Sequence, residues 1–390
     1  MLAEAQNIKH ELIEWRRAIH RQPELGFEVY QTAELVSKTL GGMGIEVQTG
    51  VGKTGVVAYL GSEDGPVIAI RADMDALPIL EENEGEYVSQ VPGVMHACGH
   101  DAHTAMLLGV ARLLNQEQFP GQIRLLFQPA EEVADEEGIS GAPRMIADGA
   151  LEGVDAVIAL HVDGKTPTGE IRISDGWVGA GADTFRADII GVGGHGAYPH
   201  QTIDSIWLAT HVLNALYAIP SRQVRPLEPS VVTVGIISGG SADNVIPDRV
   251  YIEGTLRSFA DDVREQLIEE VERALSITQA LGGDYHLEIE RGYPPQSNDP
   301  RLAGWIREVG SALIGAEKVN GYQKSMGSED FSFMSQAVRG AMFNLGVKPP
   351  GKDPLYLHTA TFDIDEEALP IGSAIMAETA LRFLRGEFLS

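Results

Sequence analysis

The sequence predicts a mixed α/β fold, in which helices flank a mostly parallel sheet and a smaller α+β domain is inserted into the chain. Near-continuous apolar runs alternate with helical patterns in the outer parts of the chain. This pattern of predicted strands and helices changes near residue 184, and the first pattern returns near residue 293. Apolar strands separated by helices are typical of a parallel sheet that is buried on both faces.

The outer elements can be read in order along the chain. Ile8, Leu12, Trp15 and Ile19 recur at helical spacing and predict an amphipathic first helix. Apolar runs then predict buried strands, with a helix over 104–114 between the first two, and these strands are 67–70, 123–127, 154–160 and 341–347.

The middle of the chain predicts a β-α-β-β-α-β order, which is that of the ferredoxin-like split βαβ motif. Asp261 and Asp262 are suited to cap its second helix and to interact with the helix dipole. We therefore expect a main domain in two parts, 1–181 and 293–390, with the inserted domain at 182–292.

Composition excludes several classes of protein. The chain has 29 Lys and Arg against 56 Asp and Glu, a formal charge of −27, which argues against binding of nucleic acid or an anionic membrane surface. No run approaches the roughly 18 apolar residues of a membrane span. The single cysteine cannot form an internal disulfide, and the first residues lack a signal-peptide pattern, so we expect a cytoplasmic protein.

Side chains able to bind metals follow the predicted buried strands, at the edge where ligands bind in α/β sheets. In chain order they are Asp73 and Asp75, the Cys and His residues of 95–103 (MHACGHDAH), Glu131 and Glu132, His161, and His358. Nitrogen, sulfur and oxygen ligands of this kind suit a pair of divalent cations.

Each of these residues also has a structural interpretation when it is taken alone. His96 and His103 are suited to cap the following helix, and Asp73 and Asp75 to cap a turn. A lone buried cysteine is most often a small hydrophobic residue. Convergence of five segments on one edge favours the metal site over these interpretations.

The motifs RADMDALP, MHACGHDAH, FQPAEE, ALHV, GGHGAYPH, NVIPD, GTLRSF, GSEDF and LHTATFDID occur in this order along nearly the whole chain. In these motifs the chain resembles the metal-dependent amidohydrolases that include hippurate hydrolase, indole-3-acetyl-amino-acid hydrolases and N-acyl-L-amino-acid amidohydrolases. That family is similar to the co-catalytic zinc carboxypeptidases and aminoacylases. The resemblance implies a zinc-exopeptidase-like catalytic domain, with the insertion as a lid or dimerisation domain.

The resemblance also implies roles for individual residues. Glu131 would be the general base, and Asp75 would orient a ligand imidazole. Relatives in the wider carboxypeptidase group carry His in place of Asp73, which leaves the role of Asp73 open. The implied metal ligands are Cys98, His100, Glu132, His161 and His358.

Three residues of the insertion are implicated by the same resemblance. His195 would stabilise the oxyanion, in some relatives across a dimer, and Asn244 and Arg257 would hold the substrate carboxylate. A turn histidine and a strand-end surface charge are the structural alternatives for His195 and Arg257.

We therefore predict hydrolysis of the amide bond in N-acyl-amino acids or related small carboxylates, by a water held between two divalent cations. Zinc or manganese is expected, and cobalt or nickel is also compatible with these ligands. The alternatives are a carboxypeptidase or dipeptidase and, from another class, an inactive metal-binding protein. The partners expected are the small substrate and further copies of the chain, as a homodimer or tetramer through the insertion. Residues 133–140 depart from the family pattern and add three acidic side chains, which predicts poor activity on very acidic substrates.

Overall fold

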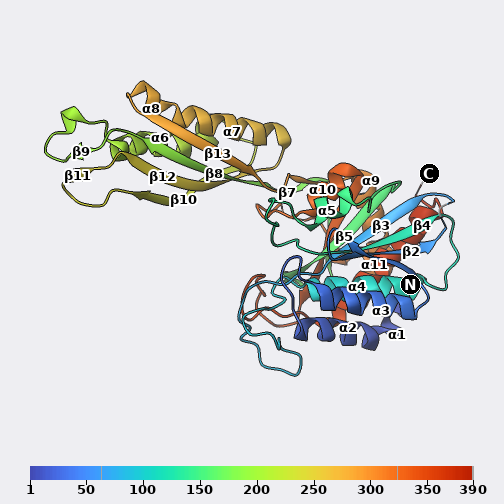
Figure 1. Ribbon diagram of the computed structural model, residues 1–390. Helices are drawn as coiled ribbons and strands as arrows, with labels where there is room; N and C mark the ends of the chain where they lie inside the picture. Colours follow the sequence, from blue (N-terminus) through green and yellow to red (C-terminus); the bar gives the residue numbers. More distant parts are fainter. Residues whose placement is uncertain (63, 323, 389–390) are drawn as a thin grey trace. The chain divides into compact units, whose positions relative to one another are not determined.

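The computed structural model describes residues 1–62, 64–322 and 324–388, and the chain divides into two compact units. The first unit comprises the described residues of Met1–Gly176, Ser297–Gln323 and Asp330–Ser390, and the second comprises Trp177–Gln296 and Lys324–Glu329. Each unit has its own sheet and its own helices (Figure 1).

The first unit is built on an eight-stranded mixed sheet. Its strands are β1 (Glu46–Val51), β2 (Gly55–Gly61), β3 (Val67–Asp73), β4 (Gln122–Gln128), β5 (Ala156–Pro167), β6 (Ile171–Arg172), β15 (Val319–Asn320) and β16 (Arg339–Lys348). They lie in the order β1-β2-β4-β3-β5-β16-β6-β15, and β4, β3, β5 and β16 are parallel neighbours. β2 is antiparallel to β1 and β4, and β6 to β16. The mostly parallel sheet predicted from the sequence is thus confirmed.

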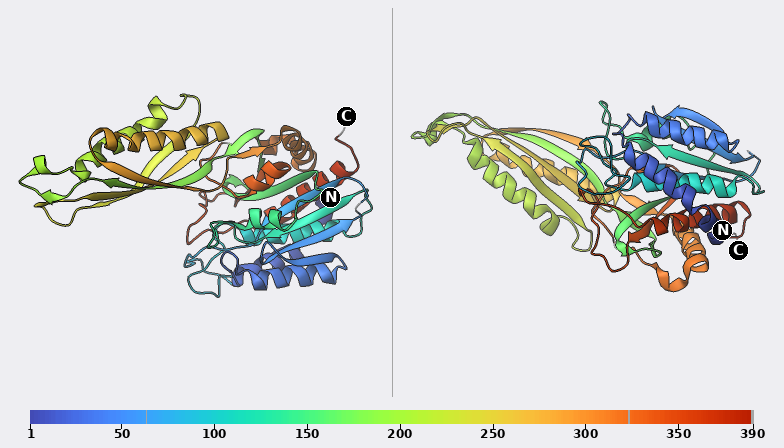
Figure 2. Two further views of the ribbon diagram at one scale, coloured as in Figure 1. Left: turned by 45° about the horizontal axis from the view of Figure 1, so that its top comes forward. Right: turned by 90° about the horizontal axis from the view of Figure 1, so that it is seen from below.

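Both faces of this sheet are buried, which explains the near-continuous apolar runs. Ile68 and Ile70 of β3 belong to a large cluster on one face, and Val67 and Ala69 to a second cluster on the other. Helices cover both faces (Figure 2). The larger cluster packs with α1 (Leu2–Asn7), α2 (Lys9–Arg21), α3 (Tyr30–Gly42), α4 (His100–Leu114), α9 (Pro300–Ile314) and α11 (Leu369–Leu384), and the smaller with α5 (Gly141–Ala147) and α10 (Phe331–Ala337).

The second unit is an antiparallel sheet with two long helices. Its elements are β8 (Gly181–Ile190), β9 (Gly194–His195), α6 (Ser205–Arg222), β10 (Ser230–Gly239), β11 (Val245–Ile246), β12 (Arg249–Ser258), α7 (Asp261–Leu275), α8 (Ile277–Ala280) and β13 (Asp284–Arg291). The long strands lie in the order β10-β12-β8-β13, and β9 pairs with β11. The chain order β8, α6, β10, β12, α7, β13 is the β-α-β-β-α-β order of the split βαβ motif.

The helix starts in this unit show how capping works locally. Asp204, which the sequence analysis did not single out, accepts hydrogen bonds from the backbone amides of Ile206 and Trp207 and caps α6. The prediction that Asp261 and Asp262 cap the second helix is wrong. Ala260 is the N-cap of α7, and the two aspartates lie in the first turn, where they interact favourably with the helix dipole.

The remaining short elements are β7 (Gly176–Gly179), β14 (Gln296–Asn298), η1 (Pro199–Gln201), η2 (Ala316–Lys318) and η3 (Glu366–Ala368). Across residues 1–62, 64–322 and 324–388, none of the helices has both the length and the apolar character needed to span a bilayer.

Candidate metal centre

The first unit carries most of the predicted site residues near strand ends or in the loops that follow. β3 ends at Asp73 and β4 ends at Gln128, three residues before Glu131. β5 differs from the prediction, because it continues through His161 to Pro167 instead of ending there. His161 therefore lies within a strand and pairs with Asn344 of β16.

The segment MHACGHDAH also differs from the prediction, because α4 begins at His100 and not at Thr104. Gly99 is the N-cap, with a left-handed φ of 86° that suits glycine. A Cβ atom at this position would lie 2.4 Å from the Cγ2 atom of Val162. This close approach places Cys98 and His100 against the middle of β5, next to His161.

The five predicted ligands and Glu131 meet in one cluster. Their donor atoms form overlapping groups within 4.8 Å, namely Cys98 with His100 and His161, Cys98 with Glu132 and His358, and His100 with Glu131 and Glu132. Cys98, His100 and Glu132 each belong to two of these groups, so the three groups overlap at their donor atoms. The Sγ atom of Cys98 lies 3.4 Å from Nε2 of His161, and Oε1 of Glu132 lies 3.3 Å from Nε2 of His358.

Hydrogen bonds to backbone carbonyls fix which imidazole nitrogens face the cluster. Nδ1 of His100 donates to the carbonyl of Asp75 over 2.8 Å, and Nδ1 of His161 donates to the carbonyl of Val162 over 2.8 Å. Each ring therefore keeps an Nε2 lone pair for a metal. Nε2 of His100 and Oε1 of Glu132 are buried and have no hydrogen-bond partner among the described residues. Orphaned acceptors of this kind, beside a thiol, are the donor set that a divalent cation satisfies.

Asp75 holds the loop that carries both glutamates. Its two carboxylate oxygens each accept a hydrogen bond over 3.0 Å, one from the backbone amide of Glu131 and one from that of Glu132. Its own backbone carbonyl accepts from His100. Asp75 thereby connects the two glutamates to the imidazole of His100 through both its side chain and its backbone.

The electrostatics of the cluster favour a bound cation. Burial raises the pKa of the Cys98 thiol well above its usual value. Burial opposes charge on His100, but Asp73 and Cys98 together raise the pKa of this imidazole. Burial also opposes charge on Glu132, yet the nearby imidazole of His358, 3.3 Å from Oε1, lowers the pKa of that carboxyl. A cation would reverse the effect of burial on Cys98 and stabilise its thiolate.

A buried network under the cluster was missed by the sequence analysis. Arg71 donates from Nε to Gln128 over 2.9 Å, from Nη1 to Asp73 over 2.7 Å and from Nη2 to Asp330 over 3.0 Å. Asp330 also accepts from the hydroxyl of Ser140 over 2.7 Å. One guanidinium thus joins three segments, and the GSEDF motif supports the site through its aspartate. The sequence signal for this network was the pair of charged residues, Arg71 and Asp73, that directly follows a buried apolar strand.

The acidic loop at 133–140 carries less unpaired negative charge than its sequence suggests. Asp135 lies 2.5 Å from Nζ of Lys53 and 2.7 Å from Nη2 of Arg144, and Glu137 also pairs with Arg144. These ion pairs, with the hydrogen bond from the amide of Ile139 to Asp135, fold this loop onto its own unit. Local pairing weakens the argument that this loop repels acidic substrates.

The second unit holds the other three predicted residues, and it brings only two of them together. His195 pairs with Val245 between β9 and β11, and Gly196 donates to the carbonyl of Asn244 over 2.8 Å, so His195 and Asn244 are neighbours. Arg257 lies near the other end of β12, whose first residue is Arg249. Arg249 and Arg257 are eight residues apart, which at about 3.4 Å per residue is roughly 27 Å along the strand. Asn244 precedes Arg249 in the chain. Asn244 and Arg257 of one chain therefore do not meet at one small carboxylate.

Local contacts set the states of His195 and Arg257. Nδ1 of the exposed His195 accepts from the amide of Ala197 over 3.1 Å, which leaves Nε2–H as a free donor. Arg257 is half-buried beside Thr255 and donates to the carbonyl of Leu256 over 3.0 Å. Burial lowers the pKa of its guanidinium, which stays charged at neutral pH.

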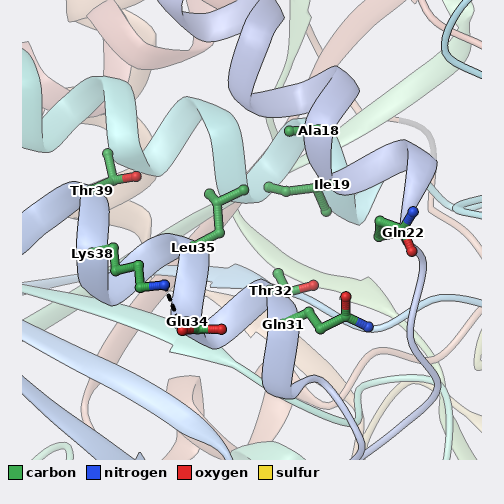
Figure 3. A pocket seen from close by; sticks show the side chains of 9 residues that line it. All are labelled: Ala18, Ile19, Gln22, Gln31, Thr32, Glu34, Leu35, Lys38 and Thr39. Atoms are coloured by element: carbon green, nitrogen blue, oxygen red, sulfur yellow. Dashed lines mark ion pairs between the residues drawn. The ribbon is translucent and has the colours of Figure 1, made fainter.

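A cavity of about 410 Å³ lies elsewhere in the first unit, between α2 and α3 (Figure 3). Its lining consists of Ala18, Ile19, Gln22, Gln31, Thr32, Glu34, Leu35, Lys38 and Thr39. None of these residues belongs to the metal-ligand cluster.

Comparison with known proteins gives a family and several close relatives. The model of "Peptidase family M20/M25/M40" matches residues 69–382. The chain is 40% identical over 388 residues to the IAA-amino acid hydrolase ILR1-like 4 of Arabidopsis thaliana, covering 96% of this chain and 87% of that protein. It is 39% identical to thermostable carboxypeptidase 1 of Saccharolobus solfataricus, covering 97% of each. It is 40% identical to the N-acetyl-L-cysteine deacetylase of Bacillus subtilis, covering 97% of this chain and 89% of that one.

Solved structures agree. A protein of methicillin-resistant Staphylococcus aureus whose structure is described under the name aminohydrolase has a TM-score of 0.93 at 34% identity, covering 98% of this chain and 99% of that chain. A Bacillus subtilis protein described as a dinuclear metal-binding peptidase has a TM-score of 0.85 at 34% identity, covering 97% and 99%. The predicted family resemblance, fold class and assignment as a metal-dependent hydrolase of amide bonds are confirmed. The chain belongs to peptidase family M20/M25/M40.

Proposed function

We propose that this protein hydrolyses the amide bond of N-acyl-amino acids that carry a free carboxylate. The observation that carries the proposal is the set of overlapping donor groups in which Cys98, His100 and Glu132 are shared and to one of which Glu131 belongs. Such sharing suits two cations close together and leaves one carboxylate for proton transfer.

In this proposal Cys98, His100, Glu132, His161 and His358 hold two divalent cations per subunit. Zinc or manganese is expected, and cobalt or nickel would suit the same donors. When bound, such cations polarise a substrate carbonyl and make a water molecule more acidic. We also propose a cytoplasmic location, because a reducing compartment preserves the single thiol as a ligand.

Glu131 acts as the general base and then as the general acid. It takes a proton from the attacking water and returns it to the nitrogen of the leaving amine. Water and the amide thereby become a carboxylic acid and an amine, with no net change of protons. Asp75 fixes the position of Glu131 through its backbone amide, which keeps the carboxylate aimed at the water.

The inserted domain, predicted at 182–292, binds the rest of the substrate. His195 donates from Nε2 to the developing oxyanion, and Asn244 and Arg257 bind the substrate carboxylate. Because Asn244 and Arg257 lie near opposite ends of β12, we propose that one comes from each of two copies of the chain. The insertion is thus both lid and dimerisation domain.

An exposed sheet edge supports this dimer. β10 lies at the edge of its sheet, with Ile236 51% exposed and Ile237 56% exposed. Trp207, on the adjoining α6, is 47% exposed. Apolar residues on an open strand edge suit pairing with the same strand of a second copy.

The substrate class is supported by the names of the relatives. One relative is described as acting on IAA-amino acids and another on N-acetyl-L-cysteine. Both substrates are acylated amino acids. A carboxypeptidase activity is the second candidate, because two Saccharolobus relatives at 39% identity carry that name.

A substrate panel tests the proposal. Purified enzyme loaded with Zn²⁺ or Mn²⁺ is assayed on acetyl-, benzoyl- and indoleacetyl-amino acids, on their carboxamide analogues, and on dipeptides and peptides. We expect turnover of acyl-amino acids and at least tenfold lower kcat/KM for the carboxamides. Preference for peptides would favour the carboxypeptidase, and absence of turnover with every metal would overturn the proposal.

A further inference from the structure

His103 lies in the first turn of α4, is buried, and uses both of its ring nitrogens. Nδ1 is 2.6 Å from Oδ1 of Asp73, and Nε2 is 2.9 Å from the backbone nitrogen of Val162. A backbone amide can only donate, so Nε2 accepts this bond and Nδ1 carries the proton that it donates to Asp73. The imidazole is therefore neutral and held in one tautomer.

The hydrogen bonds of His103 also decide whether this residue can be a metal ligand. Asp73, His100 and His103 have donor atoms within 4.8 Å of one another and so could be taken for a further cation site. A cation ligand needs a free lone pair, and the only lone pair of His103 is engaged by Val162. The contacts thus favour a bracing function for His103 over a ligand function.

Asp73 is in turn fixed from several directions. Its Oδ2 accepts from Nη1 of Arg71 over 2.7 Å, and its backbone carbonyl accepts from the hydroxyl of Thr104 over 2.8 Å. Asp73 is thus an immobile acceptor for His103. A histidine that is anchored in this way can hold a backbone group in place.

The group that it holds belongs to the residue beside a metal ligand. The carbonyl of Val162 accepts from Nδ1 of His161 over 2.8 Å, and its amide donates to His103. Both backbone groups of Val162 are therefore committed, one to each histidine. The orientation of the His161 ring depends on the position that His103 gives to Val162.

We propose that His103 is a positioning residue of the metal centre, which links Asp73 to the backbone of Val162 and so aims His161, and that it is not itself a ligand. The inference rests on the proposed function, because it assigns a supporting residue to the same centre. It also gives Asp73 a role as the anchor of this link.

Two substitutions separate the halves of the link. His103→Asn places an amide near the Nδ1 position and can keep the bond to Asp73, whereas His103→Gln places an oxygen near Nε2 and can keep the bond to Val162. Leu107→Ala, one turn along the same buried helix face, is the control for loss of packing alone. Affinity and stoichiometry for Zn²⁺ alone are measured by equilibrium dialysis, and site geometry by the absorption spectrum with Co²⁺.

We expect two ions per chain in every variant. Affinity should fall about 10- to 100-fold in His103→Asn, fall less in His103→Gln, and remain unchanged in Leu107→Ala. The Co²⁺ spectrum should change in His103→Asn. Loss of one ion in both His103 variants would identify His103 as a ligand, and unchanged affinity in both would reduce it to packing. Either result overturns the inference.

Two further measurements on the wild-type protein test the tautomer of His103 directly and separate this inference from the proposed function. In wild-type protein labelled with ¹⁵N-histidine, the NMR spectrum should contain a buried Nδ1–H imidazole that is absent from His103→Gln, and a protonated Nε2 at His103 would overturn the inference. Wild-type protein that binds no Zn²⁺ would overturn the proposed function, whereas normal Zn²⁺ binding with unaffected His103 variants would overturn this inference alone.

Discussion

The carboxylate of Asp330 holds the amide of Gln128, whose Nε2 lies 2.8 Å from Oδ1 and 2.9 Å from Oδ2. Gln128 precedes the loop that carries Glu131 and Glu132. The same carboxylate accepts from the hydroxyl of Ser140 at the far end of this loop and from the amide of Ala142 over 2.9 Å. Asp330 therefore holds both ends of the loop that carries Glu131, the proposed general base.

We expect Asp330→Asn to destabilise the protein and loosen this loop. The substitution removes the charge that pairs with buried Arg71, and breaking a buried pair costs about 3–5 kcal/mol. Urea unfolding measures the change in free energy, and Zn²⁺ affinity should fall with it. Asp175→Asn is the control, because its ion pair with Arg307 is exposed and should be worth less than about 1 kcal/mol. Equal stability of the two variants would contradict this role of Asp330.

Glu131→Gln should abolish turnover and keep the metals. Glutamine has nearly the same shape but cannot accept the proton, so kcat should fall by roughly 10²- to 10⁴-fold. Metal content by mass spectrometry should stay near that of the wild type. Glu136→Gln, at an exposed position of the same loop, is the matched control and should keep full activity. Substantial activity in Glu131→Gln would exclude Glu131 as the base.

Removal of metal should lower thermal stability as well as activity. Ions that bind only the folded state stabilise it, by about 2.7 kcal/mol at a free concentration one hundred times the Kd. We expect a strong chelator to lower the Tm of the wild type and of Glu131→Gln. The shift should be much smaller in His358→Ala, which lacks a proposed ligand. The same Tm with and without chelator in the wild type would argue against a structural contribution of the ions.

The stability of the first unit should depend on pH through His20. Burial opposes charge on this imidazole, but Asp101 at 2.7 Å and Glu81 at 3.2 Å raise its pKa from 6.5 to about 9, against a smaller opposing effect of Arg16. A group with a raised folded pKa stabilises the protein fully below its unfolded pKa and loses this contribution as the pH rises. The contribution, on the order of 3 kcal/mol, should therefore be present below pH 6.5 and disappear through pH 9.

The measurement is the free energy of unfolding of wild type and His20→Gln between pH 6 and 10. The difference between them should narrow across this window. His10→Gln serves as the control for the substitution itself, since His10 is an exposed histidine of the same helix. A constant difference for His20→Gln would show that the ring is neutral in the folded protein.

Two inactive variants should restore activity to one another. If His195 acts across the dimer, a mixed dimer of Glu131→Gln and His195→Ala contains one site with both native residues. Mixing the two with subunit exchange should recover up to about a quarter of the wild-type activity, because half of the dimers are mixed and each has one native site. Ile237→Lys in both chains should prevent recovery and yield monomers in analytical ultracentrifugation. Absence of recovery in proven mixed dimers would place His195 in its own chain's site.

Strong local patterns made the fold predictable from the sequence. The buried strands β3, β4, β5 and β16 are apolar on both faces, and their order with the helices indicated the parallel sheet. Boundaries were less predictable, because β5 continues past His161 into residues of lower apolar content. Helix α4 begins at His100, where Gly99 in a left-handed conformation supplies the turn that residue types alone did not indicate.

The candidate site was predictable where ligands follow strands, and it was less predictable in its supporting residues. The sequence predicts Asp73 and His103 as candidate metal-binding residues, with turn and helix caps as the alternatives and the role of Asp73 open. Nothing in the spacing of one chain reveals a bond between residues 30 positions apart. Asp330 lies 202 positions from Gln128, so only tertiary structure shows their contact. The separation of Asn244 from Arg257 along β12 likewise follows from strand length and not from motif content.

The guanidinium of Arg71 reaches Asp73, Gln128 and Asp330 at once. The edge of the sheet that carries the proposed metal site is consequently not modular. A loop taken from a relative, or a redesigned segment between residues 128 and 142, will function only if it supplies matching hydrogen-bond acceptors for the guanidinium of Arg71. Engineering of new substrate preferences should therefore begin in the middle of the loop and leave its two ends, at Gln128 and at Ser140, unchanged.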